Sequence, residues 1–134
     1  MIKVVGIDHL EISVSNFQKS KNFYGKLFKF LGFKILFQFP GVIGWTNKNT
    51  QYIIKQALAR YKRYKHAKGM IGFHHYAFEL SKKKNVDELC QFLVRNKIPI
   101  LDPPKFYPEY GGLYYAVFFT DPDGLKLEGM HLGR

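Results

Sequence analysis

Three side chains in predicted strands of this 134-residue chain are able to bind a divalent metal. His9 lies in an alternating apolar stretch, His75 ends a His-His pair, and Glu128 follows an Asp-Pro-Asp-Gly turn by four residues. Two imidazoles and a carboxylate suit Zn²⁺, Ni²⁺, Mn²⁺, Fe²⁺ or Mg²⁺, and the absence of a thiolate leaves the choice open. Such an ion can act as a Lewis acid that stabilises an oxyanion or an enediolate. The fold must bring the three side chains together for this chemistry.

An internal repeat supports that requirement. Residues 7–12 superimpose on residues 73–78, and His9 then lies opposite His75. One half of the chain buries too little surface to be stable alone, so two copies must combine. We therefore predict an α+β fold of two βαβββ modules in one domain, residues 1–134, with module one at about 2–58, a basic linker at about 59–70 and module two at about 71–132.

The first module begins with a predicted strand over residues 2–15, in which His9, Glu11 and Ser13 share a face. Asn16 is a suitable N-cap for a helix that ends at Gly32. Three short apolar stretches separated by turn residues predict the remaining strands. They cover residues 33–37, 42–46 and 52–57.

The second module repeats this order. Residues 71–80 form the predicted first strand, in which His74 points away from His75 and has a structural role. Asn85 and Glu88 resemble a capping box that opens the helix. The remaining predicted strands cover residues 98–101, 113–120 and 125–132, and residues 103–112 form a candidate mobile loop.

The charge balance favours anionic partners. The net charge is +11, and much of it lies in residues 60–68, where basic residues alternate with tyrosines, and in Lys82–Lys84. No nucleic-acid-binding signature accompanies either stretch, so we interpret residues 60–68 as a solvated loop and expect no nucleic-acid partner.

No apolar run approaches the roughly 20 residues that span a bilayer, and Asp8 and Glu11 interrupt the N-terminal stretch. We expect a cytoplasmic protein with no membrane partner. Cys90, the single cysteine, fits the apolar pattern of a helix and is interpreted as a small hydrophobic residue.

Three segments together resemble the vicinal oxygen chelate superfamily, which includes glyoxalases, bleomycin-resistance proteins and dihydroxybiphenyl dioxygenases. The segments are residues 7–10, 72–78 and 115–128. The resemblance implies metal ligands on the first and fourth strands of each module, and it assigns His9, His75 and Glu128. In the fourth strand of module one Gln56 is the candidate oxygen donor, although Ile53 or Ile54 can instead occupy the ligand position and leave three protein ligands.

The resemblance also implies a function. The first hypothesis is a metal-dependent lyase, isomerase or thiol transferase that acts on an anionic or thiol-conjugated small molecule, with Glu128 as the catalytic base. The alternative is a metal-free protein that binds a drug or metabolite, and an extradiol dioxygenase fragment ranks last. Relatives of this size commonly form homodimers, and the cleft can form within one chain or between two.

Overall fold

The computed structural model describes residues 1–133 and divides into two compact units, Met1–Lys65 and His66–Arg134. The boundary falls in the basic segment between the two repeats. Each unit has the order strand, helix, strand, strand, strand, and each contains one four-stranded sheet. This order confirms the predicted α+β class with two βαβββ modules.

The first unit contains a mixed sheet with the strand order β1-β4-β3-β2, in which β1 is parallel to β4 and the other neighbours are antiparallel. Its elements are β1 (His9–Val14), α1 (Phe17–Phe30), β2 (Lys34–Phe39), β3 (Val42–Thr46) and β4 (Gln51–Gln56), followed by the short 3₁₀ helix η1 (Ala59–Tyr61).

Helix α1 begins where the sequence predicts. The Asn16 side chain accepts a 3.0 Å hydrogen bond from the Lys19 backbone N–H, which satisfies one of the free donors of the first turn. Aromatic side chains join the helix to the sheet: the Phe28 ring lies 5.2 Å from the Trp45 ring and 4.9 Å from the Tyr52 ring, centroid to centroid. The helix therefore covers the sheet face that carries Trp45 and Tyr52.

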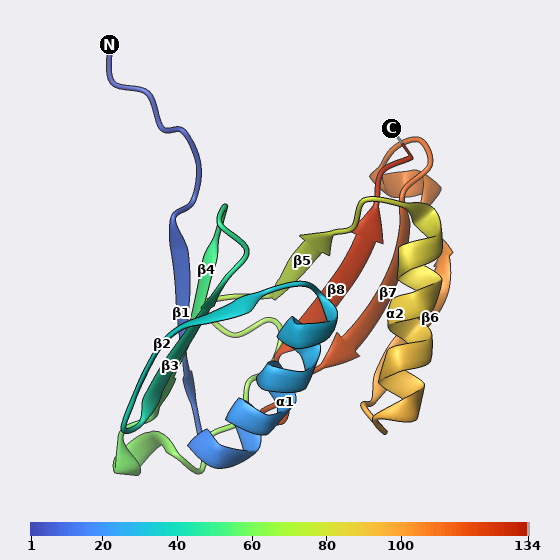
Figure 1. Ribbon diagram of the computed structural model, residues 1–134. Helices are drawn as coiled ribbons and strands as arrows, with labels where there is room; N and C mark the ends of the chain where they lie inside the picture. Colours follow the sequence, from blue (N-terminus) through green and yellow to red (C-terminus); the bar gives the residue numbers. More distant parts are fainter. Residues whose placement is uncertain (134) are drawn as a thin grey trace. The chain divides into compact units, whose positions relative to one another are not determined.

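Strand β1 is shorter than predicted. It starts at His9, whereas the sequence pattern predicts a strand from residue 2. Its neighbour β4 starts at Gln51, whose N–H donates to the Asp8 carbonyl, so the chain before residue 8 runs past the end of β4 (Figure 1). Within β1 the odd-numbered positions are exposed and the even-numbered ones are partly or fully buried, which confirms that His9, Glu11 and Ser13 share a face.

The second unit repeats the topology with the order β5-β8-β7-β6, in which β5 and β8 are parallel. Its elements are β5 (His75–Glu79), α2 (Lys83–Arg95), β6 (Ile100–Phe106), the 3₁₀ helix η2 (Pro108–Tyr110), β7 (Tyr115–Thr120) and β8 (Lys126–His131). Figure 1 shows α2 running along this sheet. Within residues 1–133 no helix combines the length and apolar character needed to cross a membrane.

The predictions for the start of α2 and for the segment around Pro103 are wrong. Asn85 is not the N-cap of α2, because the helix starts at Lys83 and Asn85 instead donates to the Glu88 carboxylate within the first turn. Strand β6 also continues through Pro103 and Pro104, which the sequence pattern assigned to a loop. As an edge strand with irregular register, β6 tolerates residues that lack a backbone N–H.

The two faces of the second sheet differ. Helix α2 presents Val86, Leu89 and Leu93 as fully buried residues, and a Cβ on Gly129 would lie 2.3 Å from Leu89 Cδ2. Glycine at this position therefore lets the helix approach β8 closely. Because successive strand residues point to opposite faces, Glu128 faces away from α2.

Candidate functional site

Glu128 is positioned by the turn that joins β7 to β8. The Asp121 carboxylate accepts hydrogen bonds from the backbone N–H groups of Asp123 (2.9 Å) and Leu125 (2.8 Å), and Gly124 takes the positive φ of 82° that the turn requires. This turn fixes the hairpin register that places Phe118 opposite Glu128. The Asp-Pro-Asp-Gly motif thus places the Glu128 carboxylate on the sheet face opposite α2.

His75 meets Glu128 across the parallel pair β5 and β8. Ala77 is the register partner of Glu128, and His75 precedes it by two residues on the same face. The His75 Nε2 atom lies 3.0 Å from Glu128 Oε2, and the two side chains are 33% and 3% exposed. The structure therefore brings together two of the residues that the sequence predicts as metal ligands.

The Glu128 carboxylate is buried and has a hydrogen-bond donor on each oxygen. Oε2 faces His75, and Oε1 accepts a short hydrogen bond from the Tyr114 hydroxyl. An unpaired carboxylate in this position would cost several kcal/mol. Burial, followed by the hydrogen bond to Glu128, raises the pKa of Tyr114 above its ordinary value, so this hydroxyl remains a donor at neutral pH.

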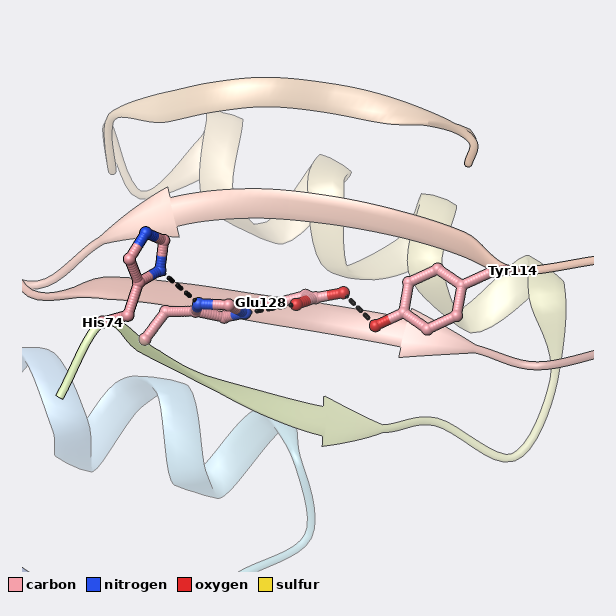
Figure 2. Close-up of polar contacts among 4 residues, drawn as sticks. His74, Tyr114 and Glu128 are labelled. Atoms are coloured by element: carbon pink, nitrogen blue, oxygen red, sulfur yellow. Dashed lines mark hydrogen bonds and ion pairs between the residues drawn. The ribbon is translucent and has the colours of Figure 1, made fainter. Parts of the chain in front are cut away.

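His74 also belongs to this network, and the prediction that it points away from His75 is wrong. The two Nδ1 atoms lie 2.7 Å apart, so one ring donates its N–H to the other. His74 precedes the first residue of β5 and adopts a bend, so the alternation of an extended strand does not apply to it. Figure 2 shows His74 at one end of the hydrogen-bonded chain, Tyr114 at the other and Glu128 between them.

Two imidazole contacts link this chain. His75 Nε2–H donates to Glu128, and one of the two facing Nδ1 atoms of His74 and His75 donates its proton to the other. Desolvation, and then the charges of His75 and Lys126, lower the pKa of His74 and favour its neutral form. His74 and Tyr114 therefore orient the His75–Glu128 pair from its two ends.

His9 occupies the corresponding place in the first unit. Its register partner in β4 is Gln51, just as the partner of His75 in β8 is Lys126. The Nδ1 atom of His9 lies 2.8 Å from Asp8 Oδ2, and the imidazole is 52% exposed. When Nδ1 donates to this carboxylate, Nε2 retains its lone pair, which is the usual arrangement of a metal-binding histidine.

Gln56 has other hydrogen-bond partners. Its Oε1 accepts from the Phe17 N–H (3.0 Å), and its Nε2 lies within hydrogen-bond distance of the backbone carbonyls of Val14, Ser15 and Ala57. These bonds join the end of β4 to the start of α1. Gln56 as a metal ligand remains a prediction, and its full set of partners weighs against it.

The strand register identifies the equivalent of Glu128 in the first unit. Glu128 pairs with the residue two positions after His75, and Ile53 pairs with Glu11, two positions after His9. Ile53 is 8% exposed and offers no ligand atom. Of the two alternatives from the sequence, the register therefore selects Ile53 rather than Ile54.

The His75–Glu128 pair fits a divalent ion. Ligand bonds of about 2.1 Å at right angles place two ligand atoms about 3.0 Å apart, which matches the Nε2 to Oε2 distance. Residues 1–133 contain no preassembled group of three or more His, Cys, Asp or Glu side chains suited to a metal ion. A metal ion at this pair would therefore need a further ligand from elsewhere.

Sequence reasoning missed the roles of two tyrosines on this face. The sequence offers Tyr107 and Tyr114 only among several aromatic residues that can line a cleft or fill the core, but their backbones pair through a 2.8 Å hydrogen bond that places both side chains in one cluster with Phe118. Tyr107 is 8% exposed, and its buried hydroxyl lacks a hydrogen-bond partner. The pairing of β6 with β7 would have revealed the shared face, but the two prolines obscured that strand.

Comparison with known proteins gives consistent matches over most of the chain. A 120-residue alignment with the uncharacterised Bacillus subtilis (strain 168) protein YqjT has 29% identity and covers 90% of this chain and 94% of the relative. The structure of a glyoxalase candidate from Bacillus halodurans has 27% identity and a TM-score of 0.81, with 93% and 94% of the two chains covered.

A more distant structure shares the fold. Lactoylglutathione lyase from Agrobacterium tumefaciens has 17% identity and a TM-score of 0.69, with 96% of this chain and 94% of that chain covered. The family model for the Glyoxalase/Bleomycin resistance protein/Dioxygenase superfamily matches residues 6–128, which include all the candidate ligands. The chain therefore belongs to the glyoxalase/bleomycin resistance protein/dioxygenase superfamily.

Proposed function

We propose that this protein binds one divalent metal ion through His9, His75 and Glu128 and acts on an anionic small molecule as an isomerase, a lyase or a thiol transferase. The observation that carries the proposal is the buried Glu128 carboxylate, 3.0 Å from His75 on the sheet face opposite α2. A divalent cation neutralises such a buried carboxylate and, when bound, stabilises a developing oxyanion or enediolate on the substrate.

The residues around this pair have distinct tasks. Tyr114 holds one oxygen of Glu128, so that only the other oxygen points toward His75. His74 and Asp8 fix the ring orientations of His75 and His9, respectively, through Nδ1. Glu128 is the candidate base, since it is the buried carboxylate at the centre of this arrangement.

Ile53 limits the number of protein ligands to three in this proposal. An apolar residue at the register equivalent of Glu128 leaves more coordination positions for substrate oxygens or water than a four-ligand site would. The same residue favours a second candidate function, a metal-free protein that binds an anionic drug or metabolite. The two candidates differ in whether the folded protein needs metal.

Metal analysis of protein purified without chelator separates these candidates. We expect stoichiometric divalent metal in the wild type and its loss in His9→Ala and His75→Ala. His131→Ala is the matched control, because His131 lies on the same sheet but its Nδ1–H donates to the Leu80 carbonyl and not to Glu128. Folded wild-type protein that neither contains nor takes up metal would contradict the first candidate and support the second.

A further inference from the structure

The Tyr107 hydroxyl is a buried polar group that none of the interactions described above uses. Tyr107 is 8% exposed, and its hydroxyl has no hydrogen-bond partner among residues 1–133. The backbone pairing of Tyr107 with Tyr114 places it on the same sheet face as Glu128. Buried hydroxyl groups in proteins are almost always hydrogen-bonded, so this exception needs an explanation.

Neighbouring side chains hold the Tyr107 ring but leave its hydroxyl free. The ring stacks on Tyr110 at 5.5 Å with an interplanar angle of 11° and meets Phe118 edge to face, also at 5.5 Å. Glu128 is not its acceptor: the hydrogen bonds to the two carboxylate oxygens come from His75 and Tyr114. The hydroxyl is thus a preorganised donor, and burial raises the pKa of Tyr107 to about 12, so it keeps its proton at neutral pH.

Two ammonium groups flank the aromatic pair. Lys105 Nζ lies 4.9 Å from the centre of the Tyr107 ring, and Lys126 Nζ lies 4.2 Å from the centre of the Phe118 ring. Asp102 is the opposing charge on β6, where it pairs with Phe118, and Glu109 acts on Tyr107 from η2. Ala116 and Met130 add apolar surface beside the rings. A donor, two ammonium groups and apolar surface together suit a molecule with an anionic oxygen and an apolar body.

We propose that the Tyr107 hydroxyl donates a hydrogen bond to an oxyanion, such as a carboxylate, of a small molecule whose apolar part lies against Phe118 and Met130. Lys105 and Lys126 add electrostatic attraction for that oxyanion. This inference rests on the proposed function, since the bound molecule is the one on which the His75–Glu128 site acts. It identifies the substrate class as an apolar carboxylate or a related oxyanion and Tyr107 as the residue that selects it.

Calorimetric titration with benzoate and its uncharged analogue benzamide tests this inference on metal-free and Zn²⁺-loaded protein. We expect the wild type to bind benzoate more tightly than benzamide, and Tyr107→Phe to weaken benzoate binding about tenfold, or about 1.4 kcal/mol. Tyr110→Phe is the matched control, because it keeps the stacked ring and the Tyr107 hydroxyl. The affinity for Zn²⁺ should be unchanged in both variants.

Thermal unfolding distinguishes a ligand-binding hydroxyl from a structural one. Removing a hydroxyl that has no partner in the unliganded protein should leave the Tm of Tyr107→Phe unchanged or raise it. A lower Tm combined with unchanged benzoate affinity would overturn the inference, and so would a wild type that binds benzoate no better than benzamide. If Zn²⁺ fails to bind but Tyr107→Phe still weakens benzoate binding, the proposed metal site is wrong and the oxyanion site stands.

Discussion

The two units have the same topology and the same register between their first and fourth strands, but the sheet faces opposite their helices differ at one central position. In the second unit Glu128 occupies it, between Ala77 and Phe118. In the first unit Ile53 occupies it, next to Gly44. A Cβ on Gly44 would lie 2.6 Å from the Phe37 ring, so an aromatic side chain covers that part of the face. One βαβββ framework thus presents an apolar packing surface in one copy and a polar site in the other.

The largest loss of metal affinity should come from replacing Glu128, the residue that distinguishes the two units. Glu128→Ala should weaken metal binding by more than about 100-fold, because loss of outer partners alone costs about 10–100-fold. Ile53→Ala should leave metal affinity unchanged but lower the free energy of unfolding by about 2–5 kcal/mol, as expected for a buried isoleucine. Metal competition titrations and urea unfolding measure the two effects. Equal metal affinities in the two variants would contradict the assignment of Glu128 as a metal ligand and of Ile53 as a packing residue.

Transferring the carboxylate to the first unit should reduce stability in a pH-dependent way. Ile53→Glu buries a carboxylate without a partner, and we expect a cost of about 2–4 kcal/mol at pH 7. Burial raises the pKa of such a group in the folded state above about 4.3, so the cost is small below pH 4 and grows as the pH rises through the folded pKa. Urea unfolding at pH 4 and pH 7 measures this, with Ile53→Gln as the uncharged control. A pH-independent cost would contradict the interpretation.

Gln56→Ala tests whether the side-chain oxygen of Gln56 binds metal. The Gln56 amide joins β4 to the start of α1, and its loss should lower the free energy of unfolding by about 1–2 kcal/mol. Metal affinity should not change. A loss of metal as large as that of His75→Ala would instead identify Gln56 as a ligand.

The smallest predicted effect is an alkaline titration within the second unit. Burial raises the pKa of Tyr107, and a hydrogen bond to Asp87 raises the pKa of Tyr115, each to about 12. The unfolded chain releases these protons near pH 10 and the folded protein releases them later, so stability should fall as the pH rises from about 10 to 12. Tyr115→Phe should reduce this loss, as measured by unfolding at pH 9 and pH 11. An unchanged pH dependence would contradict the assignment.

Local sequence signals predicted the parts of the fold that depend on local interactions. Asn16 caps α1 because its side chain reaches a backbone group three residues away. The Asp121 turn sets the register of β7 against β8 through its own hydrogen bonds, and the repeat then places His75 on the strand beside Glu128. The fold class followed from these signals, and the family resemblance assigned His75 and Glu128 to one site.

Features that depend on the ends of neighbouring strands were not predictable. Strand β1 starts at His9 because its partner β4 starts at Gln51. His74 turns toward His75 because β5 starts only at His75, so His74 lies outside the strand. Residue counting suggested Gln56 as the oxygen donor, whereas the parallel pairing of β1 with β4 selects Ile53. Strand register between segments distant in sequence decides each of these points.

The most direct test of the proposed metal ligands is X-ray absorption spectroscopy of the Zn²⁺-loaded protein, which counts imidazole ligands. We expect two imidazoles and oxygen ligands in the wild type, and one imidazole in either His9→Ala or His75→Ala that still retains zinc at high metal concentration. A spectrum with a single imidazole in the wild type, unchanged in His9→Ala, would contradict the proposal that both His9 and His75 bind the metal.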